Sequence, residues 1–262
     1  MYYHLSDHIY VTQFRDELIL LDAKKDKYTI CFKDFSKFVL QILTTTGLPS
    51  NVDLRKNHQA LASSQSENSL QTVLGEDALP NLALIQKLLD DGILEQKESP
   101  YPFCIDQKPH SDGVSNVDWR LPLKNKKIRI NGHVLKALWI LIKVNAYIKF
   151  KGFYPSLQLI QSSRDPQVAY IIPREYELRN LANIVNKACL LYPSRTKCLE
   201  WAMTYVLMAL QRKWKCNLEI GVQNYPFFAH AWVECNGKIV MDEQNLREGL
   251  AIILNEPFRR TI

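Results

Sequence analysis

The strongest constraint on the fold is a short segment near the C-terminus of the chain. In residues 228–235, FAHAWVEC, small or apolar residues alternate with His230, Trp232 and Glu234. This alternation places the two sets of side chains on opposite faces of a β-strand. Asn236-Gly237 follows, a dipeptide that strongly favours a two-residue hairpin turn. The sequence therefore predicts a hairpin of residues 227–235 and 238–241, with its small side chains facing a core and His230 on the other face beside an indole.

Asp242 follows the second strand of this hairpin. Counted outward from the turn, Asp242 and His230 lie near the same end, so the carboxylate can accept a hydrogen bond from one ring nitrogen of the imidazole. A carboxylate in that position fixes the tautomer of a histidine and stabilises its protonated form. The pair is a candidate for general acid–base chemistry.

Cys198 is the candidate nucleophile. The segment PSRTKC introduces a helix that we predict over residues 196–214, with Ser194 or Thr196 as its N-cap. Cys198 then lies in the first turn, where unpaired N–H groups and the helix dipole favour a thiolate and can stabilise an oxyanion. A cysteine on a helix is more often a small core residue. Cys198 is a candidate nucleophile because a candidate histidine and a candidate aspartate follow it in the order Cys, His, Asp.

The rest of the second half of the chain fits an α+β domain. Helical stripes occupy residues 134–148 and 175–191, and strand-like alternation begins at residues 217–222. Helices followed by strands are typical of the α+β class. Gln158 and Gln161 are weak candidates for completing an oxyanion hole.

The first half predicts a small winged-helix-like domain. Three short strands fit within residues 8–32, a helix follows Asp34, and a second helix begins near Pro80 and stops at Asp91-Gly92 before a strand at 93–95. Residues 49–78 are polar and predict a loop with a weak helix near 69–74. We therefore predict domains at 1–99 and 128–262, joined by a proline-rich linker at 100–127.

Composition excludes several classes of protein. Hydrophobic residues make up 47% and charged residues 23% of the 262, which excludes wholesale disorder. The N-terminus has no signal-peptide pattern and no stretch is apolar enough to span a bilayer, so we expect a cytoplasmic protein with mostly reduced cysteines. No Cys or His spacing indicates a metal site. Residues 119–164 contain no Asp or Glu, but they lack the aromatic spacing of a single-strand nucleic-acid platform, so we expect no nucleic acid partner.

A helix-start Cys, then His-Ala-Trp-Val-Glu, then a hairpin followed by Asp resembles the transglutaminase-like, papain-like cysteine proteases. Cys198-Leu199-Glu200 and residues 220–222 and 229–234 further resemble the lasso-peptide B proteins, over about residues 131–255. This resemblance implies a Cys198–His230–Asp242 triad that needs no cofactor and removes the leader from a ribosomally made antibiotic precursor. It also implies, as a partner, an ATP-dependent cyclase of the asparagine-synthetase-like type.

The first half resembles, by pattern alone, the leader-recognition element related to the small chaperone of pyrroloquinoline quinone biosynthesis, which is PqqD-like. Such elements bind a precursor leader as an added strand between their third strand and third helix. Here the resemblance implies contacts from the strand of residues 27–32 and the helix of residues 81–90. The predicted leader-binding residues are Tyr28, Ile30, Phe32, Leu84 and Leu88.

Two alternative functions fit the same residues. The triad could transfer the acyl group to an amine in place of water, since both reactions share the acyl-enzyme. Alternatively, a winged helix with the basic stretch after Trp119 could form a DNA-binding regulator with an inert C-terminal domain; a triad in matching order has no purpose in such a protein.

Overall fold

The structure is a computed structural model that describes residues 1–44, 78–115, 119, 121 and 130–262. The predicted loop over 49–77, with its weak helix near 69–74, and part of the predicted linker lie outside these residues. Contacts divide the chain into two compact units, one of residues 1–9 and 37–102 and one of residues 10–36 and 103–262. These units are each made of two separate segments, whereas we predicted two domains that are each continuous, at 1–99 and 128–262. The predicted domain boundaries therefore stay a prediction.

The first unit contains a two-stranded antiparallel sheet. Strand β1 (Tyr2–Leu5) pairs with β5 (Leu94–Lys97). Helix α4 (Ala78–Asp90) packs on β5, and Gly92 follows its end with a φ of 68°, which suits a glycine after a helix. Helix α1 (Lys33–Thr44) begins in the second unit and continues into this one. The predicted helix stop and the strand after it are confirmed.

One sheet of the second unit is built from the first part of the chain. Its strand order is β4 (Lys27–Cys31), β3 (Glu17–Asp22), β2 (Ile9–Phe14) and β6 (Gln107–Lys108). The three strands predicted within residues 8–32 are confirmed, and β3 pairs with β4 antiparallel, Ile19 opposite Ile30. Within the described ranges β4 pairs with β3 alone, so β4 is an edge strand.

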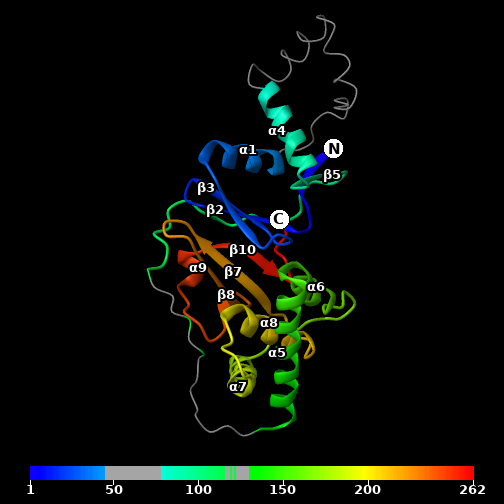
Figure 1. Cartoon of the computed structure of the whole chain (residues 1–262), viewed down its shortest axis with the longest axis vertical. Coiled ribbons are helices and arrows are strands. Elements are labelled where there is room, and N and C mark those ends of the chain that lie inside the picture. Colours follow the sequence, from blue (N-terminus) through cyan, green and yellow to red (C-terminus); the bar gives the residue numbers. More distant parts are fainter. Residues whose placement is uncertain (45–77, 116–118, 120, 122–129) are drawn as a thin grey trace, which may run out of the picture. The chain divides into compact units, whose positions relative to one another are not determined.

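The second sheet of this unit follows a group of helices, as the α+β prediction requires (Figure 1). The helices before the sheet are α5 (Gly132–Lys151), α6 (Phe153–Ser162), α7 (Glu175–Leu191) and α8 (Cys198–Leu210), and α9 (Leu246–Gly249) lies before the last strand. The strand order is β10 (Ala251–Glu256), β7 (Asn217–Gln223), β8 (Phe228–Cys235) and β9 (Lys238–Ile239), all antiparallel. Helix α8 is shorter than the predicted 196–214, and β1, β6, α6, α9 and β10 were not predicted.

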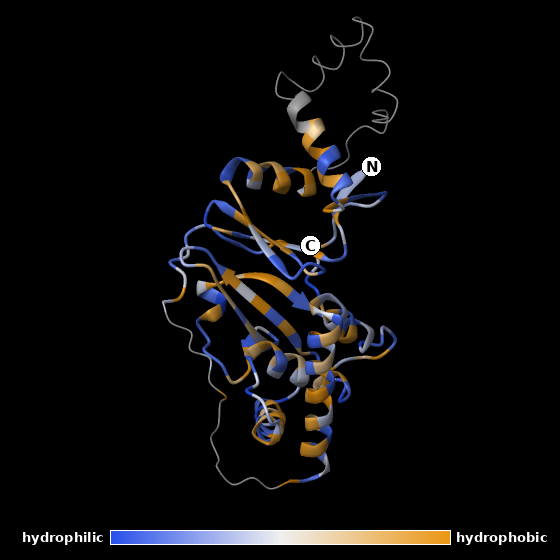
Figure 2. Ribbon diagram, in the orientation of Figure 1, coloured by the Kyte–Doolittle hydropathy of each residue, from blue (hydrophilic) through white to orange (hydrophobic). Residues whose placement is uncertain are grey.

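Helix α8 is the centre of the second unit. Every residue from Trp201 to Leu210 is buried, because the helix packs on β7 and β8 and also on α5 and α7. A helix that is mostly apolar on every side is stable only when it is surrounded, and its neighbour α5 is also mainly orange in Figure 2. The same core includes Tyr10, Phe14, Ile19 and Leu21, so β2 and β3 share a core with the helices.

Helix α5 carries four lysines of the basic stretch. Lys136, Lys143, Lys149 and Lys151 are all exposed, which agrees with a solvated helix face. None of the helices in the described ranges has the length and apolar character to cross a membrane.

Gly221 on β7 offers a test of this packing. A Cβ added there would lie 2.4 Å from the Trp232 ring and 2.8 Å from the Leu250 Cβ. We expect Gly221→Ala to lower the free energy of unfolding by about 1–3 kcal/mol, the usual cost of overpacking a core. Chemical denaturation measures it. Gly132→Ala is the matched control, because nothing lies within 4 Å of the added Cβ and Gly132 begins a helix; equal losses in both variants would contradict the packing.

Candidate active site

His230 lies on the face of β8 that points away from the helices. Ala231, Val233 and Cys235 belong to the core that contains α8, as the alternation predicted. The His230 ring lies between its two neighbours on the other face, with centroid distances of 6.1 Å to Phe228 and 6.0 Å to Trp232. Its side chain is only 2% exposed, so the imidazole is shielded from water.

The hairpin turn brings Asp242 to His230. Asn236 and Gly237 have φ values of 51° and 82°, as a type I′ turn requires, and Cys235 pairs with Lys238. The strand β9 is shorter than the predicted 238–241, because Met241 adopts a φ of 58° and turns the chain out of the sheet. Asp242 Oδ2 then lies 2.8 Å from His230 Nε2.

Cys198 is the first residue of α8. The N-cap is Lys197, so the prediction of Ser194 or Thr196 is wrong. The carboxylate of Glu200 accepts a hydrogen bond from the Lys197 N–H, and this interaction fixes the start of the helix. The Thr196 side chain is buried beside Cys189 and does not cap the helix.

Cys198 meets His230 at the free edge of β8. The Val240 N–H donates to the Val233 carbonyl, so the odd-numbered residues of β8 direct their backbone groups toward β9. Since β9 pairs only near the turn, the N–H of Ala231 is left at the edge, where it donates to the Cys198 sulfur. The Cys198 side chain also hydrogen-bonds His230. Because Nε2 faces Asp242, Nδ1 is the ring nitrogen left for the sulfur.

These contacts shift both pKa values in the sense that favours an ion pair. Burial alone would raise the pKa of the Cys198 thiol, but hydrogen bonds from His230 and from the N–H groups of Ala231 and Leu199, with the imidazolium charge, lower it below its ordinary value. Burial alone would lower the pKa of His230, but hydrogen bonds with Asp242 and Cys198 raise it to about 9. Both shifts favour the pair of a thiolate and an imidazolium over the neutral pair.

A buried polar network holds the neighbouring indole in place. Trp232 Nε1 donates to Glu219 Oε2 at 3.0 Å. The Glu219 carboxylate also accepts from Asn255 at 2.8 Å and Arg260 at 2.6 Å, and it lies 3.3 Å from Arg247 Nε. Two guanidinium groups thus compensate a fully buried carboxylate, and the indole beside His230 has a fixed orientation.

The predicted leader-binding residues lie on two elements. Strand β4 carries the half-buried Tyr28 and Ile30, whose side chain is 36% exposed. Phe32 directly follows the strand and is 79% exposed. Leu84 and Leu88 lie on α4 in the other unit; Leu84 is half-buried and Leu88 is buried.

Tyr28 lies near the nucleophile, which the sequence did not indicate. Burial raises the pKa of the Tyr28 hydroxyl above its ordinary value, and the charges of Asp26 and Cys198 raise it further. No local pattern could have signalled this proximity, because 170 positions (198 − 28) separate the two residues along the chain. Gln161, by contrast, donates to the Tyr10 hydroxyl at 3.5 Å, and Gln158 is exposed, so neither has a described contact with Cys198.

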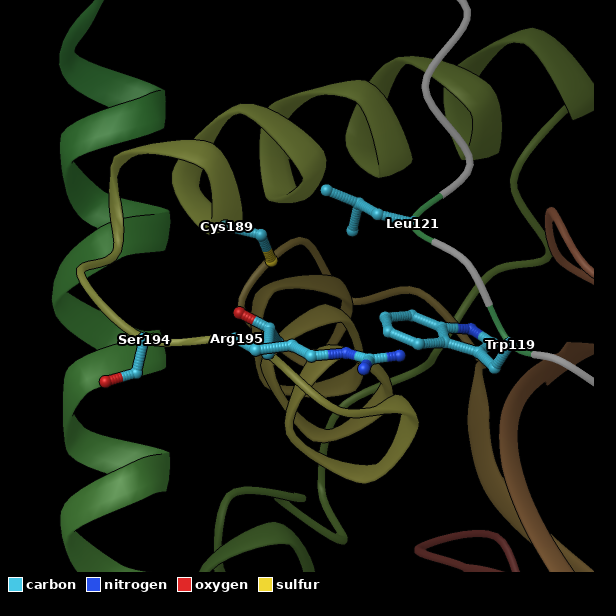
Figure 3. A pocket seen from close by; sticks show the side chains of 6 residues that line it. Trp119, Leu121, Cys189, Ser194 and Arg195 are labelled. Atoms are coloured by element: carbon cyan, nitrogen blue, oxygen red, sulfur yellow. The ribbon is translucent and has the colours of Figure 1, made fainter.

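A cavity of about 290 Å³ lies beside the turn that leads into α8. Its lining residues are Trp119, Leu121, Cys189, Ser194, Arg195 and Thr196. Figure 3 shows the Arg195 side chain extending toward the Trp119 indole. None of Cys198, His230 and Asp242 lines this cavity. Across the described parts of the chain, no three His, Cys, Asp or Glu side chains are grouped so that they could hold a metal ion.

Comparison with known proteins identifies this part of the chain. Residues 140–255 match the family model described as the transglutaminase-like superfamily, so the second unit contains a transglutaminase-like domain. The chain is also 27% identical over 169 residues to the Microcin J25-processing protein McjB of Escherichia coli, an alignment that covers 60% of this chain and 79% of that protein. The predicted resemblance to the lasso-peptide B proteins is confirmed by these two matches. No solved structure matches the chain significantly.

The ion pair predicts the pH dependence of Cys198 alkylation. Because the pKa of Cys198 is lowered, we expect iodoacetamide to modify it at a lower pH than an ordinary thiol requires. Asp242→Asn removes the carboxylate that raises the pKa of His230, so the alkylation profile should move to higher pH. Peptide mass mapping across a pH series follows this cysteine separately from the other five. Superimposable profiles for the two proteins would contradict the arrangement.

Proposed function

We propose that this protein is a leader peptidase of lasso-peptide biosynthesis, which binds a precursor leader and hydrolyses the leader–core peptide bond. The observation that carries the proposal is the hydrogen-bonded series of a helix-start thiol, an imidazole and a carboxylate. The similarity to the Microcin J25-processing protein supports the choice of substrate class.

In the first half-reaction the Cys198 thiolate attacks the carbonyl carbon of the scissile bond. The oxygen of the tetrahedral intermediate becomes negative, and backbone N–H groups at the start of α8 are the candidates to stabilise it. The His230 imidazolium then donates its proton to the leaving amine, the carbon–nitrogen bond breaks, and the leader remains attached to Cys198 as a thioester.

In the second half-reaction His230 is neutral and acts as a base. It removes a proton from water as the water oxygen attacks the thioester carbonyl, and collapse of that intermediate releases the leader carboxylate and the thiolate. Asp242 keeps the ring in the tautomer that both steps need. Side chains, backbone N–H groups and water suffice for this sequence of steps.

Leader capture is proposed for the edge strand β4. An extended peptide adds to a free sheet edge through main-chain hydrogen bonds, and side-chain contacts set its register. Two observations support this assignment: among the residues that the structure describes β4 pairs with β3 alone, and Ile30 and Phe32 are exposed. Leu84 on α4 is the remaining accessible candidate, whereas the burial of Leu88 favours a role in packing.

Capture by β4 raises the local concentration of the scissile bond, so the protease site need not bind the core tightly. After cleavage the core peptide has a free amine at its N-terminus. The resemblance to the B proteins implies an asparagine-synthetase-like cyclase as the partner that uses this amine.

Replacing the nucleophile tests the proposed reaction. Cys198→Ala should reduce cleavage of a precursor peptide by on the order of a million-fold, as for other catalytic nucleophiles, and leave leader binding intact. Intact-mass analysis of the products measures cleavage and distinguishes hydrolysis from transfer to an amine. Cys104→Ala, at an exposed cysteine elsewhere, is the control. Cleavage by the Cys198 variant at a rate close to wild type would end the protease assignment.

Leader binding by β4 is tested separately at Phe32. Because this side chain is 79% exposed, Phe32→Ala should leave stability nearly unchanged. If a leader covers the ring, its loss should raise the Kd by roughly tenfold, about 1.4 kcal/mol. Fluorescence anisotropy of a labelled leader measures this in the Cys198→Ala background, where no cleavage interferes. Phe150→Ala removes an equally exposed ring on α5; the same weakening in both variants would refute a specific site at Phe32.

A further inference from the structure

We propose that the aromatic side chains of Tyr28 and Phe227 form a substrate subsite beside Cys198, which binds an apolar side chain of the precursor on the leader side of the scissile bond. This subsite rests on the proposed function and assigns part of its specificity. Tyr28 comes from the edge strand β4, and Phe227 comes from the loop between β7 and β8 that leads into the strand of His230.

The two rings are in direct contact. Their centroids are 5.2 Å apart with an interplanar angle of 55°, a geometry that is favourable for aromatic pairs. Phe227 remains 45% exposed and Tyr28 is half-buried, so the pair offers apolar surface to a ligand. The next residue, Phe228, stacks on His230.

The loop that carries Phe227 is fixed to the sheet of β3 and β4. The Glu17 carboxylate on β3 accepts hydrogen bonds from the Asn224 amide and, at 3.2 Å, from the Tyr225 hydroxyl. Tyr225 itself is 69% exposed, which extends the aromatic surface along the loop. A loop held in this way presents a preformed surface, and preformed surfaces bind peptides at a lower entropic cost.

Proximity to the nucleophile assigns this surface to the substrate. Phe227 lies three residues before His230, directly ahead of the strand that carries it, and Tyr28 contacts Phe227, so both rings lie near the catalytic groups. The charge of Cys198 also acts on the Tyr28 hydroxyl. In the proposed complex, a peptide whose carbonyl carbon reaches the sulfur passes the aromatic pair. Since β4 captures the leader, the chain passes Tyr28 before the scissile bond, which places the bound side chain on the leader side. Two aromatic rings select an apolar side chain there over a charged one.

The test is a matrix of enzymes and substrates. Full-length precursors, each with one of the leader residues nearest the scissile bond changed to alanine, are cleaved by wild type and by Tyr28→Ala, Tyr28→Phe, Phe227→Ala and Tyr176→Ala. With the wild-type enzyme, changing one apolar leader residue to alanine should lower kcat/KM by roughly 10- to 100-fold. Tyr28→Ala and Phe227→Ala should lose most of this selectivity, because these variants already lack a ring that contacts the substrate side chain. Tyr28→Phe should retain it, and so should Tyr176→Ala, which alters an exposed ring on α7.

The outcomes separate the two proposals. If every substrate change has the same effect in wild type, Tyr28→Ala and Phe227→Ala, the subsite is refuted while the peptidase assignment stands. If wild type cleaves none of the precursors, the proposed function itself fails. Should Tyr28→Ala not fold, Phe227→Ala still decides, because its side chain is the more exposed of the pair.

Discussion

The site depends on one two-residue turn and the hydrogen bond that it makes available. Asn236 and Gly237 fold the chain back so that Asp242 Oδ2 comes within 2.8 Å of His230 Nε2. The bond fixes which ring nitrogen remains for Cys198. Without it the imidazole could rotate, and the pKa of His230 would fall, because burial opposes its protonation. The electrostatics of the site therefore follow from the register of the hairpin.

A half-buried thiolate beside a buried imidazolium is stable only if hydrogen bonds replace the water that both ions lose. Taking an ion out of water costs several kcal/mol even after relaxation. Cys198 recovers this from the imidazolium and from the N–H groups of Leu199 and Ala231. The first N–H belongs to a helix start and the second to a strand edge. Both donors are backbone N–H groups, so replacing a side chain cannot easily remove either hydrogen bond.

The sequence predicted those features that depend on neighbours along the chain. Alternation identified the face of β8 that carries His230, and Asn236-Gly237 identified its hairpin. Strand β10 was missed because all six of its residues are buried, so it shows no alternation. Strand β1 was missed because its partner β5 lies about 90 positions away. The proximity of Tyr28 to Cys198 has the same origin: contacts between distant segments depend on packing, which periodicity does not encode.

An edge strand can serve capture and catalysis together because the two use different directions of the strand. A captured leader would pair with the backbone groups in the plane of the sheet, whereas Tyr28 projects perpendicular to that plane, toward Phe227. Main-chain pairing and side-chain recognition therefore do not compete for the same atoms. Since β3 and β4 belong to the same compact unit as Cys198, the distance from captured leader to nucleophile is set by the fold. An extended peptide advances about 3.3 Å per residue, so this fixed distance also selects which peptide bond reaches the sulfur.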